Sequence, residues 1–171
     1  MRLKSVISSV LVLLVGASAY AQDYLAQIRE VNMPPALEAS WHRSYHSPML
    51  QEPLESEGRV YIQEPSQLRW ETLSPVPNQI IFTGQEERGR FRMPTDKDFR
   101  YSVSEDAQNL VILTPLRRDL KQLFKEIQLI VNPESLLIEQ VRITGRDGDW
   151  TLLTFTDIKH PVALPATLFQ K

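Results

Sequence analysis

The chain of 171 residues contains no cysteine. This absence excludes disulfide bonds, thiol catalysis and thiolate metal sites. It also excludes a lipid-anchored cysteine, so the exported chain is not expected to be a lipoprotein itself. The length suits one domain with a sizeable core.

Motifs of common catalytic sites are missing as well. The sequence has no Gly-x-Ser-x-Gly elbow, no phosphate-binding loop and no His-Glu-x-x-His zinc motif. It has no internal repeat and no basic cluster, and its formal net charge is −2. A mildly acidic chain of this kind is a poor candidate for binding nucleic acid. We therefore expect neither an enzyme nor a cofactor.

The N-terminus has the pattern of a secretory signal peptide. Two basic residues precede an apolar run from Val6 to Gly16, and Ala19-Tyr20-Ala21 follows as a small-x-small cleavage pattern. A retained membrane anchor is the alternative, but the run is shorter than the ~20 residues that a bilayer requires. We predict a signal peptide at residues 1–21 and a single exported domain at residues 22–171.

Cleavage would also change the charge. Removing Arg2 and Lys4 lowers the 19 basic residues to 17 against 21 acidic ones, a mature net charge of −4. No other stretch is apolar enough to span a membrane.

The stretch from Leu54 to Pro75 shows period-two alternation on both sides of a Glu64-Pro65-Ser66 break. One face is apolar, and the other carries Arg69 and Glu71. The apolar set is Val60, Ile62, Leu68 and Trp70. This pattern predicts an antiparallel hairpin with one buried and one wet face.

Alternation and turn residues predict the other elements. A helix is expected from a capping Asp23 to Val31, ended by Asn32-Met33-Pro34-Pro35. The segment from Pro94 to Gln108 is polar and is predicted to be irregular. Further strands are predicted at residues 37–46, 79–83, 89–93, 109–114, 125–131, 136–144 and 150–158, the last two joined by an Asp-Gly turn.

Leu116 to Gln128 fits both helical and strand spacing. We favour a short helix near Asp119 to Phe124 before the strand at 125–131. The tail from Pro161 to Phe169 is punctuated by proline and is expected to pack along the sheet.

Nine or so antiparallel strands with little helix predict a mainly β fold. A sheet of that size curls, because strands twist. We expect an incomplete antiparallel β-barrel, a curved half-barrel sheet, with a short N-terminal helix and few covering helices. The mouth of such a barrel is a usual ligand site. The alternative is that residues such as Trp41, Phe82 and Phe91 fill a solid core.

Short motifs in a characteristic order cover most of the mature chain. They are Glu57-Gly58-Arg59-Val60 before Pro65, Leu68-Arg69-Trp70-Glu71 before Pro75, Ile80 to Gly84, Leu113-Thr114-Pro115, Leu120 to Ile127, Asp147-Gly148-Asp149 through Phe155, and Leu164-Pro165 with Leu168-Phe169. Together they resemble the LolA family, the periplasmic carriers that take lipoproteins from the inner to the outer membrane of Gram-negative bacteria.

The resemblance implies a monomeric, non-enzymatic periplasmic chaperone for lipoprotein transport in outer-membrane biogenesis. Its partners would be lipoprotein acyl chains, an inner-membrane donor complex and an outer-membrane acceptor protein. Leu68 and Trp70 match cavity positions of the family hairpin. The full set of acyl-chain candidates, extended by alternation, is Trp41, Val60, Ile62, Leu68, Trp70, Ile80, Phe82 and Phe91.

Two departures from the family pattern leave alternatives open. Glu64 stands where well-known members carry the Arg that tethers a lid, and the segment from Pro94 to Gln108 is short where lid helices are usual. One alternative is therefore a carrier of another lipid or a glycolipid in a specialised envelope pathway. A non-carrier interaction domain of the envelope is the other alternative.

Two polar sets are candidates for binding roles. Arg88, Arg90 and Arg92 alternate on one strand face and form a possible docking face for lipid phosphates or an acidic partner. The alternative is a solvent-exposed strand face whose positive charge is balanced by nearby carboxylates. His42 and His46 share a strand face, but residues four apart on a strand lie about 13 Å apart, too far for one ion to bridge. We therefore expect no metal site.

Overall fold

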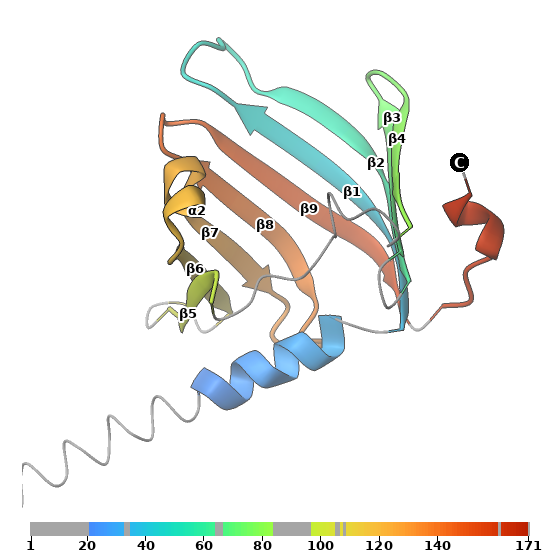
Figure 1. The fold of residues 1–171 in the computed structure, drawn as a ribbon, viewed down its shortest axis with the longest axis horizontal. Coiled ribbons are helices and arrows are strands. Elements are labelled where there is room, and N and C mark those ends of the chain that lie inside the picture. The colour runs from blue at the N-terminus through green and yellow to red at the C-terminus, as the bar shows by residue number, and fades with distance from the viewer. Residues whose placement is uncertain are drawn as a thin grey trace, which may run out of the picture.

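The computed structural model describes residues 21–32, 35–63, 67–83, 97–104, 107, 109–160 and 162–170. Nine strands in these ranges form one antiparallel sheet, and an N-terminal helix, residues 21–32, lies across one end of it (Figure 1). The strand order is β4-β3-β2-β1-β9-β8-β7-β6-β5, so the sheet is not closed into a barrel. The predicted mainly β, half-barrel fold is confirmed.

The elements follow the chain as a series of hairpins. The strands are β1 (Ala36–His46), β2 (Leu54–Gln63), β3 (Gln67–Ser74), β4 (Asn78–Phe82), β5 (Phe99–Val103), β6 (Leu110–Pro115), β7 (Phe124–Val131), β8 (Ile138–Gly145) and β9 (Trp150–Lys159). The short helices are α2 (Arg118–Leu123) and the 3₁₀ helix η1 (Ala166–Phe169). Within the described residues, no helix has the length and apolar character that crossing a membrane requires.

Two meanders make up the sheet. Strands β1 to β4 form one and β5 to β9 form the other, and the antiparallel pairing of β1 with β9 joins them. The first and last of the described strands, β1 and β9, therefore lie side by side at the centre of the sheet.

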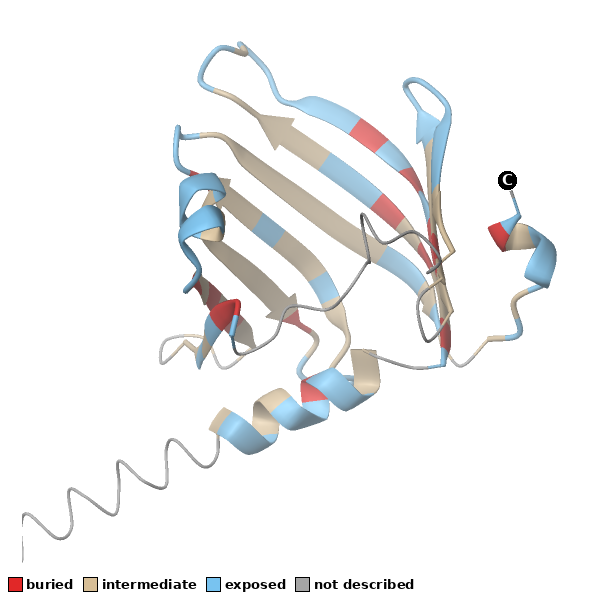
Figure 2. Ribbon diagram, in the orientation of Figure 1, coloured by how far each residue is buried: buried red, intermediate tan, exposed pale blue. Residues whose placement is uncertain are grey.

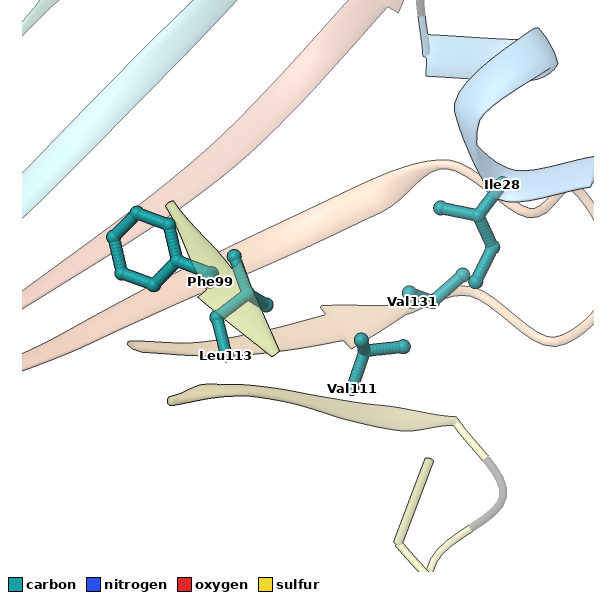
Figure 3. Packing of buried hydrophobic residues seen from close by; sticks show 5 residues of the cluster. All are labelled: Ile28, Phe99, Val111, Leu113 and Val131. Atoms are coloured by element: carbon teal, nitrogen blue, oxygen red, sulfur yellow. The ribbon is translucent and has the colours of Figure 1, made fainter. Parts of the chain in front are cut away.

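Apolar burial is divided into two clusters. The first lies between the N-terminal helix and β5 to β7, where Ile28 of the helix points toward Val111 and Val131 (Figure 3). The second lies on β1 to β3 and includes Ala39 and Val60. The helix thus covers one end of the sheet, and the hairpins of the first meander bury the other.

Asn32 fastens the helix to the sheet. Its Nδ2 lies 2.8 Å from Ile28 O and 2.7 Å from Leu136 O, and its Oδ1 accepts a 2.9 Å bond from Ile138 N. One side chain therefore hydrogen-bonds both to backbone near the end of the helix and to backbone at the start of β8. The sequence pattern predicts only the end of the helix at Asn32, not these long-range contacts.

Several predicted elements are confirmed within one or two residues. They include both strands of the central hairpin, the helix at residues 118–123 and the strand that follows it. The turn after β7 is longer than predicted, because Leu136 adopts a φ of 58° and β8 begins at Ile138. The predicted strand at 89–93 lies outside the described residues.

Two predictions were wrong. Asp23 lies inside the helix instead of capping it, and its side chain accepts a 2.9 Å bond from Gln27 Nε2. The segment from Pro94 to Gln108 is not wholly irregular, since it contains β5. Phe99 and Tyr101 alternate with exposed Arg100 there, which is a strand pattern too short to stand out within polar sequence.

Replacing Asn32 with Ala should lower the free energy of unfolding by about 2–3 kcal/mol, because part-buried backbone groups at Leu136 and Ile138 would lose their partner. Urea denaturation followed by circular dichroism measures the loss. The matched control is Asn78→Ala, whose side chain makes a local exposed bond to Gln79 N; it should change stability by less than about 0.5 kcal/mol. Equal losses in the two variants would contradict the fastening role of Asn32.

Candidate functional site

Cross-strand register gathers apolar side chains on one face of the first meander. Residues directly opposite one another in antiparallel strands point to the same side of the sheet. Ala39 pairs with Val60, Val60 with Trp70, and Trp70 with Ile80. The neighbouring row, two residues further along each strand, contains Leu37, Ile62, Leu68 and Phe82. Four strands therefore contribute two apolar rows to one surface.

Trp41 and Trp70 stack on this surface. Their ring centroids are 4.7 Å apart and their planes are inclined by 25°. Trp41 is only 3% exposed, whereas Trp70 is partly buried at the margin of the same cluster. Such a pair contributes about 0.5–1.5 kcal/mol beyond its area burial. The two stacked rings therefore form a rigid aromatic part of this surface, in which Trp70 is the more accessible ring.

Gly58 makes room for this stack. It is the cross-strand partner of Trp41, next to a register shift in the β2–β3 pairing. A Cβ atom at this position would lie 1.7 Å from the carbonyl oxygen of Glu71 and 2.7 Å from Cζ2 of Trp41. A glycine is therefore required where the indole ring crosses the strand.

The same surface continues into the second meander. Phe155 is the partner of Trp41, and Leu153 pairs with both Arg43 and Val141. The apolar side chains of this region are half-buried, and Figure 2 shows intermediate burial along most of β7 to β9. We call the two rows of β1 to β4, together with Trp41, Val141, Ile143, Leu153 and Phe155, the apolar face.

The opposite face is polar. Arg69 forms an ion pair with Glu71, and its Nε lies 2.6 Å from Glu71 Oε1. His42 Nε2 lies 3.3 Å from Glu55 Oε2. His46 stacks on the Trp150 ring, with centroids 5.5 Å apart. No group of three potential metal ligands occurs among the described residues.

The C-terminal segment also lies on the polar face. Arg69 Nη1 donates a 2.9 Å hydrogen bond to Leu168 O, and Phe169 is buried. Element η1 contacts β3, which agrees with the predicted packing of the tail along the sheet. The described part of the tail therefore does not cover the apolar face.

A family model described as outer membrane lipoprotein carrier protein LolA matches residues 35–87 and 91–171. The chain belongs to the LolA family. No curated protein matches it significantly.

Solved structures share the fold at low sequence identity. A LolA superfamily protein from Nitrosomonas europaea has a TM-score of 0.51 at 12% identity, with 88% of this chain and 97% of that one covered. MucB has a TM-score of 0.53 at 13% identity, with 90% of this chain and 63% of MucB covered. The complex of MucA and MucB from Pseudomonas aeruginosa gives 0.51 at 13%, with coverages of 87% and 60%.

The structure brings together most of the predicted cavity residues. Trp41, Val60 and Leu68 are buried in one cluster, with Ile62, Trp70 and Phe82 packed against it. Ile80 is on the same face but 48% exposed. Phe91 and the predicted docking residues Arg88, Arg90 and Arg92 lie outside the described residues, as does Glu64 at the LolA-family lid position.

A hollow that sequence reasoning missed lies between the N-terminal helix and β5. Its volume is about 460 Å³. The guanidinium of Arg29 lies 4.7 Å from the centroid of the Tyr101 ring there. The lining residues are Gln22, Leu25, Ala26, Arg29, Phe99, Arg100, Tyr101 and Leu116. The signal available in the sequence is the alternation of residues 99–101, which lies within a segment predicted to be irregular.

Replacing Gly58 with Ala should lower the free energy of unfolding by about 1–3 kcal/mol, because the added methyl group overlaps backbone of β3 and the Trp41 ring. Urea denaturation measures the change, with Gln79→Ala on the exposed side of β4 as the control. In an open strand position, Gly→Ala would instead stabilise by about 0.4–1 kcal/mol. A stabilised G58A protein would therefore rule out the close approach described here.

Proposed function

We propose that this LolA-family chain is a periplasmic carrier that shelters lipoprotein acyl chains on its apolar face and delivers them toward the outer membrane. The observation that supports this role most directly is the continuity of the apolar face from β4 to β8. A protein that needed only a stable core would not require half-buried apolar side chains across six neighbouring strands.

Acyl-chain binding needs little else from the protein. Each buried methylene is worth about 0.8 kcal/mol, so a long chain can bind strongly without directed polar contacts. The Trp41–Trp70 stack offers a flat, rigid surface, and the side chains of Leu153 and Phe155 extend it along β9. Rigid apolar walls bind acyl chains at low entropic cost.

The proposal assigns no catalytic step to the chain. A carrier binds and releases cargo, and release requires a partner or a competing apolar surface rather than covalent chemistry. The signal peptide predicted at residues 1–21 would place the domain in the periplasm. Donor and acceptor proteins at the two membranes complete the proposed pathway, and a specialised lipid or glycolipid is the alternative cargo.

One observation favours a second candidate function, an interaction domain without lipid cargo. Trp41, Val60 and Leu68 are each no more than 6% exposed, so this end of the apolar face is already filled by protein. MucB, which shares the fold, has been solved in complex with MucA. A solid core with protein partners would fit such a role.

The deciding experiment is native mass spectrometry of the mature protein with a triacylated lipopeptide. The wild type should form a stoichiometric complex, and Trp70→Glu should weaken it by at least about tenfold, because a carboxylate would be buried against acyl chains. The matched control is Thr156→Glu, an exposed position on the opposite face of β9, next to Phe155. This control should bind lipopeptide as the wild type does.

Folding of Trp70→Glu is checked by circular dichroism and by its urea midpoint. Val141→Glu supplies a second disruption on β8, away from the tryptophan stack. If the wild type forms no complex while a proven LolA-family carrier does so in parallel, the carrier function is wrong. Equal binding by the wild type and both glutamate variants of the apolar face would place the lipid elsewhere.

A further inference from the structure

The large hydrophobic side chains that are exposed in the described residues gather at one end of the sheet. Met49 is 93% exposed and Val76 is 72% exposed, both in turns between strands. Leu123 at the end of α2 is 61% exposed. The full set is Met49, Leu54, Leu73, Val76, Ile80, Leu116 and Leu123.

Strand register fixes their common location. Tyr45 near the end of β1 pairs with Leu54, and the adjacent His46 pairs with Trp150 at the start of β9. Gly145 at the end of β8 pairs with Phe124, which directly follows α2. The β1–β2 turn, the β3–β4 turn, the β8–β9 turn and α2 therefore lie at the same end of the sheet (Figure 1). We call residues 47–54, 73–79, 116–125 and 146–149 the turn rim.

Contacts between its parts hold the turn rim together. Arg146 Nε donates a 2.5 Å hydrogen bond to Lys121 O, which ties the β8–β9 turn to α2. A Cβ atom on Gly148 would lie 3.3 Å from Pro48 Cγ, so the β8–β9 turn also touches the β1–β2 turn. The exposed side chains are therefore presented by connected turns.

Positive charge concentrates at the α2 part of the rim. Residues 116–125 contain four basic residues and one acidic residue. Arg117 forms ion pairs with both Asp119 and Asp98, and its hydrogen bonds hold the pKa of the Asp119 carboxyl below its ordinary value. Arg117 therefore adds no excess positive charge. Arg118, Lys121 and Lys125 have no carboxylate partner within the described part of the chain and contribute the excess charge.

We propose that the turn rim is a peripheral membrane-contact surface that rests on a bilayer containing anionic lipids. Exposed apolar side chains on the turns would enter the headgroup boundary, and the basic residues around α2 would meet anionic headgroups. The acidic residues of the other turns are Glu52, Asp147 and Asp149, and they confine the electrostatic attraction to the α2 part. This surface does not depend on cargo binding at the apolar face.

The distribution of the apolar side chains favours a lipid surface over a protein partner. A stable protein interface buries about 800 Å² on each partner and centres on a compact cluster of anchors. Here Met49, Val76 and Leu123 stand on separate projections with little packing. A bilayer accommodates separate apolar tips without requiring shape complementarity.

The test is co-sedimentation of the mature protein with unilamellar vesicles. One preparation contains phosphatidylethanolamine and phosphatidylglycerol, and the other contains phosphatidylcholine alone. The wild type should partition more strongly to the first, and added salt should reduce that preference. Arg118→Gln with Lys121→Gln should weaken binding to phosphatidylglycerol vesicles by about 30-fold and leave phosphatidylcholine binding unchanged. Met49→Ser with Val76→Ser should weaken binding to both by at least about tenfold.

Two controls separate this surface from the apolar face. Arg59→Gln with Lys159→Gln removes the same charge away from the turn rim and should change partitioning by less than about threefold. Trp70→Glu should bind vesicles as the wild type does, even where it loses lipopeptide. The proposal is overturned if the wild type does not bind the vesicles that contain phosphatidylglycerol. It is also overturned by an equal loss in the charge control, or by a loss in Trp70→Glu, which would trace vesicle binding to lipid uptake by the apolar face.

Discussion

The pairing of β1 with β9 is the constraint on which the rest of the structure depends. Each meander is built from hairpins that are close in sequence, but only this ladder joins Trp41 to Phe155 and Arg43 to Leu153. Contacts of such high sequence separation form late and at an entropic cost. The complete apolar face therefore exists only when both meanders have paired, because β8 and β9 contribute the part around Leu153 and Phe155.

Curvature of the sheet follows from irregularities in its ladders. Register shifts occur between Glu38 and Ser40, between Glu57 and Gly58, and at two places in the β7–β8 pairing. Such bulges bend a strand and increase its twist, which curls an open sheet of nine strands without closing it. The two sides are covered differently as a result: the helix fastened by Asn32 covers one end of the apolar side, and the tail held by Arg69 covers part of the polar side.

Period-two alternation was sufficient to predict most of the sheet and most of the apolar face. In a strand with one buried side, every second residue is apolar, so the sequence of that strand shows which side is buried. Alternation failed at Phe99 to Val103, where only three apolar residues mark a strand within polar surroundings. It also could not reveal the partners of Asn32 and Arg69, since the bonding atoms lie 104 and 99 residues away in the chain. The family resemblance was predictable from short motifs, but its lid position at Glu64 lies outside the described residues.

The exposed and half-buried apolar residues of this fold have different physical meanings. Side chains such as Trp70 are held in place by their neighbours, so a ligand that covers them loses little conformational freedom on their account. Met49 and Val76 have almost no protein neighbours, and only an extended apolar surface can cover them. One domain therefore offers a shaped surface suited to a chain-like ligand and a row of separate tips suited to an interface. Because the first lies across the strands and the second at their ends, both can be occupied together.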